Sequence, residues 1–298
     1  MPESPRRPLR DIRRSYTGED KIAAKAGLGR RCLGLDRCTP EQRRFRAQLA
    51  LHVFNGYGTE VVSREAVYRA PDFLSYTMIA SPRYDEMAFI FRTAPRNAFG
   101  RLIADSSCDF GMPGLRLLAS DGFRTFHAVH HPTGARTVFA VRSDFETADL
   151  VARSMDTSVE HDLFERFPRA HIPLSAEEDA ALNRIPPMTE EIEILLAALI
   201  ARISAEDPSR TWAVGNWWGD PLRRPKPPGY GLESKLSLWG ADHAWTLRWN
   251  RYPYPSDLIS CLAAPEIGVT GAQAVEDGGG WAIKLGGSSL HLRYGEVK

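Results

Sequence analysis

Pro95-Arg96-Asn97-Ala98-Phe99-Gly100-Arg101-Leu102-Ile103 opens the stretch, residues 95–141, that decides the fold of this chain. Proline and asparagine are typical of a helix start. Phe99, Leu102 and Ile103 then fall on one face of a helix. Three short runs follow that are rich in Phe, Val and Thr and bounded by turn residues, at 115–118, 124–131 and 136–141. The stretch therefore predicts a short helix followed by three strands.

The same order recurs three more times along the chain. A helix expected over residues 255–262 precedes strands at 271–275, 281–285 and 290–294, the last two forming a hairpin with a Gly-Gly turn. A capping box at Thr39 starts a second helix, ahead of strands fitted to residues 59–68, 74–80 and 87–91. Thr189 caps a third helix, ahead of strands fitted to residues 211–218, 235–239 and 244–249.

This order predicts an α+β fold, built as a tandem duplication of a unit made of two helix-then-three-antiparallel-strand modules. The predicted domains are a basic, partly disordered arm with its first fifteen or so residues disordered, a first lobe, a helical linker and a Trp-rich second lobe, at residues 1–38, 39–143, 144–187 and 188–298. A capping box at Ser175 predicts a helix in the linker. DNA sliding clamps and secretion-chaperone-like domains share this general order of elements, and both suggest binding rather than catalysis.

Composition places the chain among ordinary globular proteins. It has 298 residues, of which 43% are hydrophobic and 25% charged, typical of a soluble protein with room for two domains. No apolar run reaches the length of a membrane span, and no signal-peptide pattern opens the sequence. The four scattered cysteines predict reduced thiols and a cytoplasmic location.

Basic residues concentrate at the beginning of the chain. Residues 1–46 hold 13 Lys or Arg against 6 Asp or Glu, although the whole chain carries a net charge of only +1. The helix that begins at Pro40 is expected to present three arginines on its outward side. Together with three earlier ones they could form a phosphate-binding stripe, and the full candidate set is Arg30, Arg31, Arg37, Arg43, Arg44 and Arg46. Nucleic-acid binding by this arm is one open alternative, and a solvated charged helix face is the other.

No motif for catalysis, a cofactor or a metal site stands out. His127, His130 and His131 cluster on one predicted hairpin, but two histidines four residues apart on a strand are roughly 13 Å apart, too far for one metal. Cys32 and Cys38 lack a second ligand pair. Glu276 and Asp277 are expected as solvated charges at a hairpin turn. We therefore assign no catalytic residue, cofactor or metal, and keep a metal-dependent enzyme at the histidine hairpin as a third alternative.

All seven tryptophans lie in the second lobe. Trp217 and Trp218 are adjacent, so on a strand they point to opposite faces and one of them is a candidate interface anchor. A basic, proline-rich loop follows directly. The candidate partner-binding set is Trp217, Trp218, Arg223, Arg224, Lys226 and Tyr230.

One resemblance accompanies these patterns. The opening Arg14-Ser15-Tyr16-Thr17-Gly18-Glu19, an Ala-rich segment after it and the strand entry at Gly114-Leu115-Arg116 resemble a set of uncharacterised actinobacterial proteins. The resemblance implies an actinobacterial origin and no activity. Taken together, the sequence favours a non-enzymatic cytoplasmic binding or scaffold protein, adaptor or chaperone-like, that holds an unknown protein partner through its second lobe.

Overall fold

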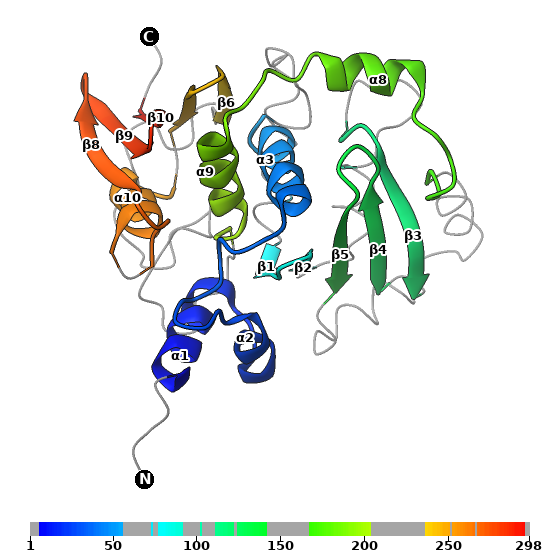
Figure 1. Cartoon of the computed structure of the whole chain (residues 1–298), viewed down its shortest axis with the longest axis horizontal. Coiled ribbons are helices and arrows are strands. Elements are labelled where there is room, and N and C mark those ends of the chain that lie inside the picture. The colour runs from blue at the N-terminus through cyan, green and yellow to red at the C-terminus, as the bar shows by residue number, and fades with distance from the viewer. Residues whose placement is uncertain are drawn as a thin grey trace.

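A computed structural model describes residues 6–55, 73, 77–91, 102, 111–121, 124–141, 167–203, 236–250, 252–265 and 267–295. In this part of the chain, helices combine with two five-stranded sheets, which confirms the α+β class (Figure 1). The strands predicted at 59–68 and 211–218 lie outside the described residues, as do most of the helix predicted at 95–103 and the first part of the predicted linker, residues 144–166. The number of strands in each predicted module therefore stays a prediction.

The first sheet contains β1 (Thr77–Pro82), β2 (Glu86–Phe91), β3 (Leu115–Asp121), β4 (Thr125–His130) and β5 (Ala135–Val141) in the order β1-β2-β5-β4-β3. The second contains β6 (Leu236–Ala241), β7 (Ala244–Trp249), β8 (Gln273–Asp277), β9 (Gly280–Leu285) and β10 (Ser288–Tyr294) in the order β6-β7-β10-β9-β8. The prediction of wholly antiparallel sheets is wrong, because β2 pairs with β5 and β7 with β10 in parallel. Long connections separate the strands of each pair, residues 92–134 between β2 and β5 and residues 250–287 between β7 and β10, so a parallel pairing is open to them.

The two halves match in register as well as in strand order. In the first sheet, Glu86 begins the parallel pairing opposite Arg136. In the second, Ala244 begins it opposite Ser289. Positions in β2 and β5 therefore have equivalents in β7 and β10, and this similarity suggests an internal duplication.

Two helices lie between the sheets (Figure 1). They are α3 (Pro40–Phe54) and α9 (Glu190–Ile200), and in each the hydroxyl of a threonine N-cap accepts a backbone N–H of the first turn, as predicted. Both helices are largely buried, and one apolar cluster runs through both halves. The third helix of this region, α10 (Pro255–Ala263), packs on β8 and β9.

The two halves are also joined by polar contacts. Arg43 of α3 pairs with Glu190 and Glu193 of α9, at 2.8 and 3.2 Å. The side-chain amide of Asn55 donates to Leu238 O and accepts from Leu238 N, so it occupies the edge of β6 as a neighbouring strand would. The two halves consequently share one apolar cluster.

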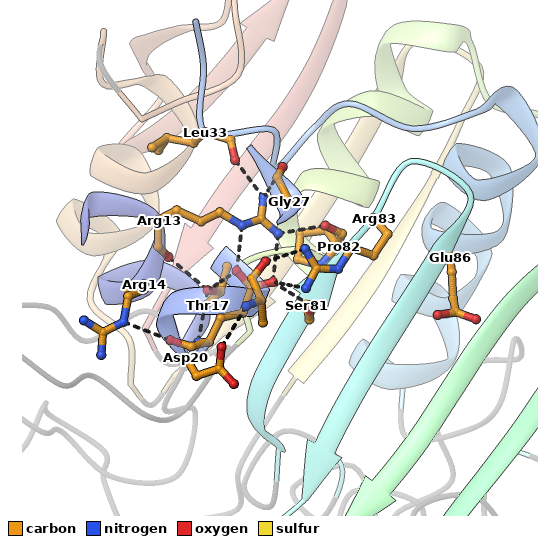
Figure 2. Close-up of polar contacts among 12 residues, drawn as sticks. Arg13, Arg14, Thr17, Asp20, Gly27, Leu33, Ser81, Pro82, Arg83 and Glu86 are labelled. Atoms are coloured by element: carbon orange, nitrogen blue, oxygen red, sulfur yellow. Dashed lines mark hydrogen bonds and ion pairs between the residues drawn. The ribbon is translucent and has the colours of Figure 1, made fainter. Parts of the chain in front are cut away.

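The N-terminal segment folds onto the first sheet, so the prediction that the first fifteen or so residues are disordered is wrong from Arg6 onward. Helices α1 (Arg6–Thr17) and α2 (Lys21–Gly27) lie against β1. Arg13 is completely buried and uses all five of its N–H groups: two bind the Glu19 carboxylate and three bind the carbonyls of Gly27, Leu33 and Pro82 (Figure 2). This buried contact fixes the arm to the body.

The remaining helix, α8 (Ala176–Asn183), begins with the predicted capping box of Ser175 and Glu178. The Glu178 carboxylate also accepts from the N–H of Gly114 and from Arg116, which ties α8 to β3. None of the helices in the described ranges is long and apolar enough to cross a membrane.

Candidate partner-binding face

The outer face of the second sheet carries the main candidate site. Side chains on β7 alternate between buried and half-buried, because Trp245, Leu247 and Trp249 point toward the helices and their neighbours point outward. The face that points outward, which we call the Trp239 face, consists of Trp239, Thr246, Arg248, Asp277, Lys284, Ser289, His291 and Arg293.

Strand register shows how these side chains line up across the sheet. One row contains Trp239, Thr246 and His291, which pair in sequence across β6, β7 and β10. In the next row, Arg248 of β7 pairs with Arg293 of β10. Two guanidinium groups and an indole ring are therefore neighbours on this face.

Trp239 is the largest exposed side chain on the sheet, with 44% of its surface accessible. The guanidinium carbon of Arg248 lies 5.2 Å from the centre of its ring, within the range of a cation–π contact. Arg248 donates no hydrogen bond to any residue that the structure describes. Its N–H groups therefore remain free to bind a ligand from outside the described chain.

Arg293 and His291, by contrast, are committed to Asp277. His291 Nδ1 and Arg293 Nη2 both lie 2.6 Å from Asp277 Oδ2. They reach across β9 because the intervening residues are small: Ala282 pairs with His291, and a Cβ at Gly280 would lie 2.6 Å from Arg293 Nη1. The hydrogen bonds from His291 and then Arg293 lower the pKa of Asp277.

The same network contains the geometry of a Ser-His-Asp relay. Ser289 Oγ lies 3.1 Å from His291 Nε2, on the side of the ring away from Asp277. Acyl transfer also requires donors for the developing oxyanion, and the nucleophile's own amide is a frequent one. Here the N–H of Ser289 donates to His243 O within the sheet. We therefore interpret the network as one that orients His291 and Arg293.

These residues were not predicted as a site. Asp277 was expected as a solvated charge, but it binds two side chains of β10. The signal that could have found them is the alternation of polar residues at 289, 291 and 293, on a strand whose other face is apolar. The partner-binding set predicted from sequence, Trp217, Trp218, Arg223, Arg224, Lys226 and Tyr230, lies outside the described residues.

The structure separates the six arginines of the nucleic-acid alternative. Arg46 is not on the outward side of α3, because it is buried and donates to the carbonyls of Arg83 and Glu86. Burial lowers its pKa. Arg43 and Arg44 pair with carboxylates of α9. The members of the set that are exposed without such a pairing are Arg30, Arg31 and Arg37. Arg37 lies over the ring of Tyr84.

The histidine hairpin does not converge on one point. His127 is exposed on β4, whereas His130 is buried, with its ring nitrogens 3.0 Å from Thr133 Oγ1 and 3.1 Å from Pro113 O. Burial lowers the pKa of His130 to about 3. His131 binds Ala170 O. Across the described ranges, no group of three or more His, Cys, Asp or Glu residues could hold a metal ion.

Comparisons with known proteins add no family to this geometry, because no protein-family model, no curated protein and no solved structure matches the chain.

Proposed function

We propose that this protein is a non-enzymatic cytoplasmic adaptor or chaperone-like protein that holds a protein partner through its second half. The single observation that carries the proposal is the exposed Trp239 ring with Arg248 stacked on it. Tryptophan and arginine dominate the binding energy of protein interfaces because they bury large areas and still offer polar contacts. The free thiols of Cys32, Cys38 and Cys261 support a reducing compartment.

The finer architecture belongs to the same proposal. A tandem duplication of a unit of two helix-then-three-strand modules would give two equivalent outer faces. The first is partly covered by α1 and α2, and the second carries the Trp239 face. A copy that is not needed to hold the N-terminal segment is free to acquire a partner.

Affinity capture with the full chain as bait tests the proposal. Wild type, Trp239→Ala and Tyr84→Ala would be compared in a lysate of the encoding organism, and each protein recovered would then be purified and titrated. Tyr84→Ala is the matched control, since Tyr84 is an exposed ring with Arg37 stacked at 5.3 Å on the first half. We expect Trp239→Ala to weaken the partner about 30-fold, the effect of a 2 kcal/mol hot spot, and Tyr84→Ala to leave it unchanged. Equal affinity in all three chains would refute the proposal.

A further inference from the structure

The first half shows what covers the position equivalent to Trp239. Ser81 pairs with Ala88, the third residue of β2, and Trp239 pairs with Thr246, the third residue of β7. Because β2 and β7 are equivalent strands, Ser81 and Trp239 occupy the same place in their sheets. Ser81 is only 5% exposed, and Trp239 is 44% exposed. One position is therefore covered and its equivalent is open.

The group that covers Ser81 is a carboxylate. Ser81 Oγ donates to Glu19 Oε1, and Arg83 Nη2 lies 3.3 Å from the same oxygen. Arg13 of α1 completes the contact from the other side. A carboxylate from the turn between α1 and α2 is thus the ligand of this position in the first half, where the hydroxyls of Ser81 and Thr17 and two guanidinium groups hold it (Figure 2).

The Trp239 face has the charge to receive a carboxylate of its own. It carries Arg248, Arg293 and Lys284 against the single carboxylate of Asp277. Arg293 is already paired with Asp277, at 2.6 Å. Of the two guanidinium groups on this face, Arg248 is the one that donates no hydrogen bond to a described residue, and its contact with the Trp239 ring at 5.2 Å positions it. A guanidinium fixed in this way is suited to a bidentate pair with a carboxylate.

The contact between Arg248 and Trp239 also favours an acidic protein segment over single-stranded nucleic acid as the ligand. A base stacks on the face of an aromatic ring, and Arg248 already occupies one face of the Trp239 ring, with its guanidinium carbon 5.2 Å from the ring centre. A carboxylate needs only the N–H edge of the guanidinium and leaves the stack intact. From these observations we propose that the Trp239 face binds an acidic segment of a partner protein, with a carboxylate paired to Arg248. The inference rests on the proposed function and names the chemistry of the partner.

The test uses the full chain and a fluorescein-labelled poly-L-glutamate of about twenty residues, with binding followed by fluorescence anisotropy at low and moderate salt. Labelled poly-L-lysine and oligothymidylate of similar length are the comparison probes. Arg248→Gln is the test variant. Arg136→Gln is the matched control, since Arg136 is exposed on the first sheet at the position equivalent to Ser289. Arg31→Gln controls for attraction to the basic arm.

We expect poly-L-glutamate to bind the wild type in a salt-dependent way, with a dissociation constant at least about tenfold higher in Arg248→Gln and unchanged in both controls. Poly-L-lysine should not bind. No binding of poly-L-glutamate, or an equal loss in Arg136→Gln, overturns the inference, as does tighter binding of oligothymidylate through Arg248. If Trp239→Ala loses a captured partner while poly-L-glutamate ignores Arg248, the proposed function stands and the acidic partner falls. If capture is insensitive to Trp239→Ala but poly-L-glutamate binding needs Arg248, the face binds acidic chains and the proposed capture of a partner through Trp239 is refuted.

Discussion

Replacing Glu19 by glutamine should destabilise the whole protein, because it leaves a buried guanidinium without its counter-charge. Glu19 and Arg13 both have side chains with no exposed surface, and Arg13 Nε lies 2.6 Å from Glu19 Oε2. Glutamine keeps the shape of the side chain and removes its charge. The change therefore isolates the electrostatic part of the contact that fixes α1 and α2 to β1.

The structure sets the size of the effect. Breaking a buried ion pair by removing one partner costs about 3–5 kcal/mol. Arg13 would retain the carbonyls of Gly27, Leu33 and Pro82, which satisfy three of its five N–H groups. We therefore expect a loss of about 3 kcal/mol, at the lower end of that range. Since proteins are stable by about 5–15 kcal/mol, this would be a large fraction of the total.

Urea unfolding of the full chain, followed by circular dichroism, measures the loss. The matched control is Asp11→Asn, which removes an ion pair with Arg10 on the exposed side of the same helix and should cost less than about 1 kcal/mol. In an Arg13→Met, Glu19→Gln double variant, the loss should be smaller than the sum of the two single losses, because each change removes the same contact. A loss in Glu19→Gln no larger than that in Asp11→Asn would refute the reasoning.

Three further predictions concern the buried polar groups and the relay. Burial alone would raise the pKa of Glu178, but the hydrogen bonds from Arg116, Ser175 N and Gly114 N hold it at about 2. The contribution of Glu178 to the free energy of unfolding is therefore present above pH 4.5 and is lost as the pH falls toward 2. The urea midpoints of wild type and Glu178→Gln should converge over that pH range. Because the pKa of His130 is lowered to about 3, the unfolded chain binds a proton at this residue below pH 6.5 while the folded chain does not. Between pH 7 and pH 5, the free energy of unfolding should therefore fall by about 2 kcal/mol more in wild type than in His130→Gln. Parallel plots of unfolding free energy against pH for the two proteins would contradict this. A fluorophosphonate probe should not label Ser289, and labelling that disappears in Ser289→Ala would show that the relay is nucleophilic.

Local signals predicted much of the fold. The strand expected at 244–249 has the bounds that the structure gives it, and the caps at Thr39, Thr189 and Ser175 all begin helices. These features depend on a few neighbouring residues: an alternation of period two, or a hydroxyl placed before the first helical turn. The sequence carries such information directly.

Those local patterns could not predict which distant segments pair with one another. The parallel contact of β2 with β5 joins residues 50 apart, such as Glu86 and Arg136. The burial of Arg46 depends on the carbonyl of Arg83 in the turn between β1 and β2 and on that of Glu86 at the start of β2. The Asp277 network depends on two small residues of β9. Each of these arrangements is set by register or by a contact that forms only after the chain has folded.

The differences between the two halves explain why the candidate site lies where it does. Inward-facing positions are alike, since equivalent residues of β2 and β7, such as Phe89 and Leu247, are both apolar and buried. Outward-facing positions are not, since Ile90 is replaced by Arg248 and Ser81 by Trp239. A buried core restricts substitution because a change in volume there costs stability, whereas an outer face is free to change. An exposed tryptophan at a place where the other half uses serine adds nothing to that core, and this difference is the observation on which the proposal of a partner rests.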